Sequence, residues 1–120
     1  MFRLDKEIEY YTRSRDLARE HGILDRELVA MANIGELWND MGNPQAALEH
    51  LIPVYNRMPD DFGAERTSDC LRNIGLAFMS MDNLDLAEEF TRRAYELVTE
   101  SGELIMAGDS VETLATVTLG

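Results

Sequence analysis

The 120-residue chain is long enough to bury a core without disulfides, and its 45% hydrophobic and 28% charged residues are typical of a folded domain. Its 11 basic and 23 acidic side chains give a net charge of −12, which disfavours nucleic acid and anionic membrane as partners. The single cysteine, Cys70, excludes an internal disulfide. No apolar run approaches the roughly 20 residues that span a bilayer. The charged stretch Asp5-Lys6-Glu7 stands where a secretory signal would have an apolar run, so we expect a cytoplasmic protein.

The apolar pattern predicts helices along the whole chain and no strand. The first helix covers residues 3–21 and ends at His21, where a cation would be favourable against the helix dipole. A second helix runs from Asp25 to Met41, because its apolar residues recur at the three-and-four spacing of an amphipathic helix. Gly42-Asn43-Pro44 then predicts a helix end, an N-cap and the first position of the next helix.

The third predicted helix continues to Met58, with Pro53 in its interior, where it removes one backbone hydrogen bond and favours a kink. A loop over residues 60–66 follows. Thr67 or Ser68 is the expected N-cap of a helix that ends near residue 81, and residues 84–100 form its partner. A last helix is expected over residues 104–118, where several β-branched residues lower the helix propensity.

The chain repeats itself at an interval of about 40 residues, which is called here the repeat interval. Asn33-Ile34-Gly35 aligns with Asn73-Ile74-Gly75, and a shift of twice that length aligns Leu4-Asp5 with Leu84-Asp85. An interval of this size indicates stacked units, each of which buries its apolar face only against its neighbours. The expected units within one domain are a half repeat (3–22), two repeats (25–59 and 67–100) and a second half repeat (104–118).

These residues resemble the tetratricopeptide repeat, whose pattern is W-x2-L-G-x2-Y, then A-x3-F, then P. In the first full copy, Gly35, Ala47 and Pro59 follow at the spacing of the family pattern. The second copy keeps Gly75 and Ala87. The resemblance covers nearly the whole chain. It implies antiparallel helix hairpins stacked into a short right-handed superhelix, an all-α solenoid of about six helices, in which the small residues let two helices approach closely.

The same resemblance implies that the first helix of each hairpin lines a concave groove that binds a peptide or a helical segment. The expected groove residues are Val29, Ala32, Asn33, Glu36, Asn39, Asp40, Asp69, Arg72, Asn73, Leu76, Met79 and Ser80. Because Arg72 is the only cation among them, we expect a protein or peptide partner with apolar or basic side chains. Asn33 and Asn73 occupy matching positions, and either a ligand or a nearby backbone group could be their partner.

The repeat interval is longer than that of the usual tetratricopeptide repeat and is similar to the longer repeats of kinesin light chains and bacterial regulators. That resemblance implies a regulatory or sensory module of a larger bacterial-type signalling protein. An alternative is a homo-oligomerisation unit without a peptide ligand, such as a homodimer through the open helical ends, because the half repeats at residues 3–22 and 104–118 each lack a partner helix.

We expect neither an enzyme nor a cofactor. Neither histidine lies in a G-x-S-x-G motif, and His50 falls in the register of packed aromatic residues. A phosphotransfer role for His50 is a further alternative, although the residues after it lack the pattern of such sites. Glu36 and Asp40 lie one helical turn apart, but no third ligand completes a metal shell.

Overall fold

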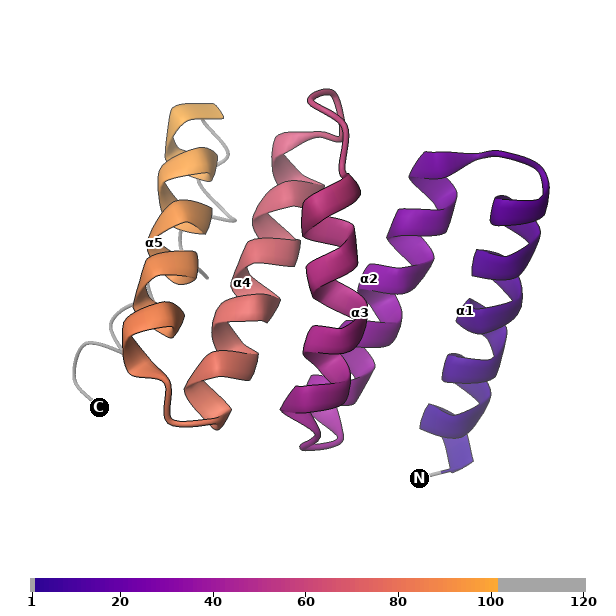
Figure 1. Cartoon of the computed structure of the whole chain (residues 1–120), viewed down its shortest axis with the longest axis horizontal. Helices are drawn as coiled ribbons and strands as arrows, with labels where there is room; N and C mark the ends of the chain where they lie inside the picture. Colours follow the sequence, from indigo (N-terminus) through magenta and orange to yellow (C-terminus); the bar gives the residue numbers. More distant parts are fainter. Residues whose placement is uncertain (1, 102–120) are drawn as a thin grey trace.

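The computed structural model describes residues 2–101, which form α-helices joined by short connections (Figure 1). The helices are α1 (Phe2–Glu20), α2 (Leu24–Asp40), α3 (Pro44–Arg57), α4 (Ala64–Ser80) and α5 (Leu84–Ser101). These residues contain no β-strand, so the expected all-α class is confirmed. The expected helix at 104–118 lies outside the described residues. Within residues 2–101, none of the helices combines the length and the apolar character needed to cross a membrane.

The turns that follow α2 and α4 share one design and lie one repeat interval apart. The amides of Asn43 and Asn83 donate to the carbonyls of Trp38 and Phe78, at 2.9 Å in both turns. The two Asn Oδ1 atoms accept from the third amide of the next helix, at 3.1 and 3.4 Å. The preceding residues adopt the left-handed conformation that this turn requires, with φ of 78° at Gly42 and 62° at Asp82. The predicted capping role of Asn43 is therefore confirmed.

The start of α4 differs from the prediction. Thr67 or Ser68 was the expected N-cap, whereas the helix begins at Ala64, directly after Gly63 with its φ of 107°. Ser68 is instead fully buried, and its hydroxyl donates to the carbonyl of Ala94 in α5 at 3.3 Å. A serine ahead of an apolar run can hydrogen-bond either to the first amides of its own helix or to the backbone of a neighbouring helix. Here it bonds to the neighbouring helix.

Two glycines bring successive helices into close contact. A Cβ atom added to Gly35 of α2 would lie 2.5 Å from Cγ of Leu51 in α3, and one added to Gly75 of α4 would lie 2.6 Å from Oγ1 of Thr91 in α5. Both distances are too short for non-bonded atoms in contact, so each crossing requires a residue without a side chain. The prediction that these glycines allow close helix approach is confirmed.

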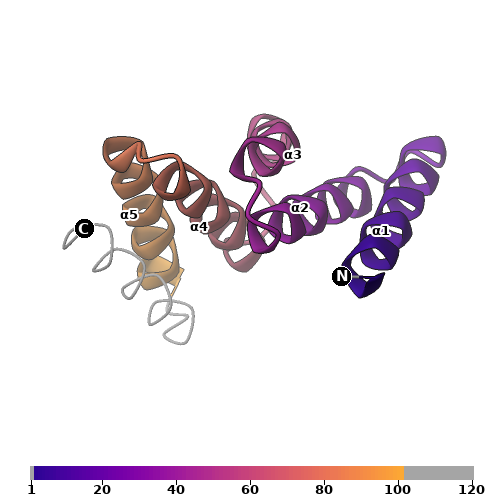
Figure 2. The same cartoon turned by 90° about the horizontal axis from the view of Figure 1, so that it is seen from below.

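The helices contact one another in a regular order. Each helix contacts the next along the chain, and α2 also contacts α4. Figure 2 shows α3 to one side of the line that α2 and α4 form, while α1 and α5 lie at opposite ends of a molecule 42 Å long. The fully buried side chains of Leu28, Leu51 and Ile74 belong to the core between α2, α3 and α4. Pro53 lies inside α3, which continues past it to Arg57.

A buried carboxylate connects the first three helices. Glu27 of α2 is only 4% exposed, and one of its oxygens accepts from Arg57 of α3 at 2.9 Å and from Arg19 of α1 at 3.0 Å. The hydrogen bond from Arg57 and then that from Arg19 hold the pKa of Glu27 below its usual value, against the opposing effect of desolvation. The two arginines therefore link α1 and α3 to the same carboxylate of α2.

Candidate functional site

The cavity between α2 and α4 brings together half of the residues expected in the groove. It encloses about 90 Å³ and is called here the α2–α4 cavity. Six of the twelve expected residues line it, with three others that were not expected. The expected residues are Val29, Ala32, Asn33, Glu36, Asp69 and Asn73; the others are Phe62, Arg66 and Cys70. The remaining six expected residues lie on the same two helices but do not line this cavity.

Contacts between the helix backbones and side chains fix the walls of this cavity. The Asn39 side chain of α2 donates to the carbonyl of Asn73 in α4 at 2.9 Å, and the Asn73 side chain donates to the carbonyl of Asp69 at 3.0 Å. Of the two partners considered for the Asn73 amide, the helix backbone is the one observed. Asp25 and Arg66 form an ion pair across the same helices at 3.7 Å. Asn39 thus connects the two helices without lining the cavity, whereas Asn73 both bonds the helix backbone and lines the cavity with Asn33 and Glu36.

The other expected residues fall into two groups. Arg72 is half-buried and lies 3.5 Å from the carboxylate of Asp69, so part of its charge is already balanced within α4. Leu76 and Met79 are half-buried on the continuation of the same helix, while Asp40 and Ser80 are exposed at the helix ends. These five residues are therefore not part of the α2–α4 cavity.

The carboxylates of Glu36 and Asp69 line the cavity together with the guanidinium of Arg66. Desolvation in the groove, followed by the neighbouring carboxylates of Asp40 and Asp69, raises the pKa of Glu36, and Arg72 opposes this shift only in part. Glu36 nevertheless keeps contact with solvent and can meet a ligand. A positive group placed beside these carboxylates would relieve their mutual repulsion.

Arg66, Phe62 and Cys70 line the α2–α4 cavity although the sequence did not predict them there. Arg66 was assigned to a loop because the start of α4 was placed at Thr67, and the earlier start at Ala64 puts it on the helix. The expectation of Arg72 as the groove's only cation is therefore wrong. Phe62, only 3% exposed, inserts from the connection before α4. An aromatic residue in a short connection rich in acidic residues was the available signal for this insertion.

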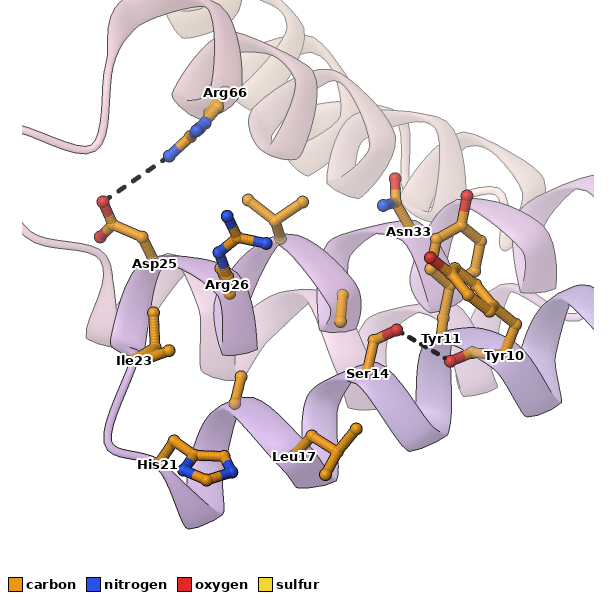
Figure 3. A pocket seen from close by; sticks show the side chains of 13 residues that line it. Tyr10, Tyr11, Ser14, Leu17, His21, Ile23, Asp25, Arg26, Asn33 and Arg66 are labelled. Carbon is orange, nitrogen blue, oxygen red and sulfur yellow. Dashed lines mark hydrogen bonds and ion pairs between the residues drawn. The ribbon is translucent and has the colours of Figure 1, made fainter.

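A second and larger cavity lies between α1 and α2 and encloses about 510 Å³; it is called here the α1–α2 cavity (Figure 3). It shares Val29, Asn33 and Arg66 with the α2–α4 cavity, so the two cavities are neighbours. Its α1 wall includes Tyr10 and Leu17, which are 65% and 56% exposed. The expected groove residues did not include this wall, because only the first helix of each hairpin was expected to line the groove.

The residues set aside as catalytic candidates have other surroundings. The Nδ1 atom of His50 lies 2.9 Å from the carbonyl of Ala46 in a half-buried position on α3, and His21 is exposed after the end of α1. Cys70 is buried, and desolvation followed by the charge of Asp69 raises its pKa to about 12. Across residues 2–101, no group of three potential metal ligands is found.

The chain matches no protein-family model, and searches of curated proteins and of solved structures also gave no match.

Proposed function

We propose that this chain is a protein-binding scaffold of the tetratricopeptide type, which holds a peptide or helical segment in the groove between α2 and α4. The partner segment carries apolar and basic side chains. The long repeat interval suggests that the scaffold serves as a regulatory or sensory module of a signalling protein. Catalysis is no part of this proposal.

The observation that carries the proposal is the convergence at the α2–α4 cavity. Six residues that the family resemblance places in the groove, from two helices one repeat interval apart, line one cavity together. Val29 and Ala32 supply an apolar wall, and Glu36 and Asp69 supply carboxylates beside it. Such a surface combines apolar contact area with a few polar groups that orient a ligand.

The charge of the groove supports the basic character of the partner. Desolvation, and after it the neighbouring carboxylates, raise the pKa of Glu36, and a bound lysine or arginine side chain would favour its charged form. Binding would then release a proton from any protonated Glu36. We therefore expect affinity for a basic peptide to fall as the pH is lowered through the raised pKa of Glu36.

Selection from a random peptide library, displayed against the full chain, tests this function. We expect the selected peptides to share basic and apolar positions, and the double variant Glu36→Lys with Asp69→Lys to bind them roughly tenfold or more weakly, a loss of about 1.4 kcal/mol or more. Fluorescence anisotropy with a labelled peptide measures this change.

A matched control separates the groove from net charge. The double variant Glu49→Lys with Glu96→Lys alters the total charge equally but lies on α3 and α5, whose residues do not line the α2–α4 cavity. We expect its affinity to stay within about twofold of the unchanged chain, because exposed charges at a distance are screened. Equal losses in the two double variants would contradict a specific groove, and so would a library that yields no binder.

A further inference from the structure

The wall that α1 contributes to the α1–α2 cavity is apolar and exposed. Tyr10 is 65% exposed, Leu17 56%, and Ile23, which follows α1 and also lines the cavity, 44%. Large apolar side chains gathered around one cavity, rather than scattered singly, mark a surface that another element covers.

The repeat register identifies what kind of element covers the equivalent surfaces. Tyr11 of α1 corresponds to Leu51 of α3 after one repeat interval and to Thr91 of α5 after two. Leu51 and Thr91 are fully buried, and each lies against the glycine of the helix that precedes its own, Gly35 or Gly75. Tyr11 is only half-buried and lines the open cavity. The α1 wall thus corresponds to the face of α3 that α2 covers and to the face of α5 that α4 covers.

The α2 wall of the cavity gives the same result independently. Arg26 and Asn33 of α2 correspond to Arg66 and Asn73 of α4 after one repeat interval. In α4 these two residues contact α2 directly, since Arg66 forms the ion pair with Asp25, and the Asn73 carbonyl accepts from the Asn39 side chain. The α1 wall of the cavity therefore corresponds to the surface of α3 that contacts α2. The α2 wall corresponds to the surface of α4 that contacts α2.

We propose that residues 104–118 of a second copy of this chain occupy the α1–α2 cavity, in the place of the first helix of a hairpin whose second helix is α1. The proposal does not depend on the peptide groove. This segment is the third occurrence of the first-helix pattern: Val111, Leu114 and Ala115 lie one repeat interval after the Leu-x2-Ile-Gly pattern of α4. Ala115 thereby places a small side chain where α2 and α4 carry glycine.

The same copy cannot supply the segment. Residue 104 follows Ser101 by three positions, which span about 11 Å at most. The cavity lies beside α1, whereas Ser101 ends α5, at the other end of a molecule 42 Å long (Figure 1). Each copy therefore offers one cavity and one segment to different neighbours, and the resulting contact is head-to-tail and can propagate.

Complementation between two variants tests this arrangement by sedimentation velocity. The cavity variant is Tyr10→Glu with Leu17→Glu, at exposed positions where a charge does not disturb the core. The segment variant is Leu114→Glu. Matched controls are Met81→Glu, at an apolar residue 47% exposed but outside the cavity, and Met106→Glu, which corresponds to Arg26, an exposed residue that does not line the α2–α4 cavity.

We expect the unchanged chain and both controls to associate with rising concentration, and each of the two variants alone to associate roughly tenfold or more weakly. An equimolar mixture of the two variants should form dimers that grow no further, because one intact cavity and one intact segment remain. A strictly monomeric unchanged chain at all concentrations would overturn the proposal. Association that ignores Leu114→Glu, or a mixture that fails to form dimers, would overturn it as well, since another face or a two-fold contact would then be responsible.

Discussion

The contact between Gly35 and Leu51 supports a prediction that depends on a single pair of residues. The variant Gly35→Ala adds a Cβ atom 2.5 Å from Cγ and 2.7 Å from Cδ2 of Leu51, so the two helices or the leucine must shift. Overpacking of this kind costs about 1–3 kcal/mol. The higher helix propensity of alanine returns about 0.5–1 kcal/mol. We therefore expect Gly35→Ala to lower the free energy of unfolding by about 0.5–2 kcal/mol.

A double-mutant cycle separates the contact from the backbone effect. Leu51→Ala alone should cost about 2–5 kcal/mol, because it leaves a cavity in the core. In that background the clashing atoms are gone, and Gly35→Ala should raise the free energy of unfolding by about 0.5–1 kcal/mol. The coupling energy between the two positions is then about 1–3 kcal/mol.

Urea unfolding followed by far-UV circular dichroism measures all four proteins, with the same concentration of a stabilising osmolyte in every sample if Leu51→Ala is too unstable alone. The control is Gly42→Ala, whose added Cβ would meet no atom within 4 Å and whose φ of 78° makes the cost one of backbone strain. Its cost of about 1–2 kcal/mol should be the same with and without Leu51. A coupling energy near zero between Gly35 and Leu51 would refute the close crossing of α2 and α3.

Three further predictions concern buried or partly buried polar groups. Thr91→Val should raise the free energy of unfolding by about 1 kcal/mol in the same assay, because the Thr91 hydroxyl is buried without a hydrogen-bond partner; a loss of stability would show that the hydroxyl is satisfied. Glu27 and Glu36 should act on stability in opposite directions with pH. The pKa of Glu27 is lowered by folding, so its contribution is complete above the unfolded pKa and is lost as the pH falls through the folded value, and Glu27→Gln should flatten this acid limb. The pKa of Glu36 is raised, so its charged form destabilises the fold as the pH rises through that value, and Glu36→Gln should stabilise the chain at neutral pH but not at pH values below about 4. Cys70, with its pKa of about 12, should resist a thiol reagent at neutral pH until the chain is unfolded; fast labelling of the folded chain would contradict its burial.

The sequence predicted best those features that depend on local chemistry. Gly42-Asn43-Pro44 combines a left-handed position, a capping side chain and a residue suited to the first helical turn, and few other structures satisfy all three. The start of α4 was mispredicted because Ser68 has a tertiary partner, the carbonyl of Ala94, which no local pattern reveals. Local signals thus predicted the number and order of the described helices, and one boundary needed the neighbouring helix.

The groove was only partly predictable for a related reason. The family resemblance placed twelve residues of α2 and α4 in the groove, and half of them line the α2–α4 cavity. Arg66 was missed through the shifted helix start, and Phe62 because a loop residue can enter the core from outside any periodic pattern. The depth of the cavity depends on how the helices cross, which sequence spacing does not specify.

The most direct test of the proposed groove is to map a selected basic peptide onto the chain by NMR chemical-shift perturbation. We expect the largest amide and side-chain shifts at Asn33, Glu36, Asp69 and Asn73, around the α2–α4 cavity, and little change along α5. Shifts concentrated on α5 or on the outer side of α3, with these four residues unaffected, would contradict the account.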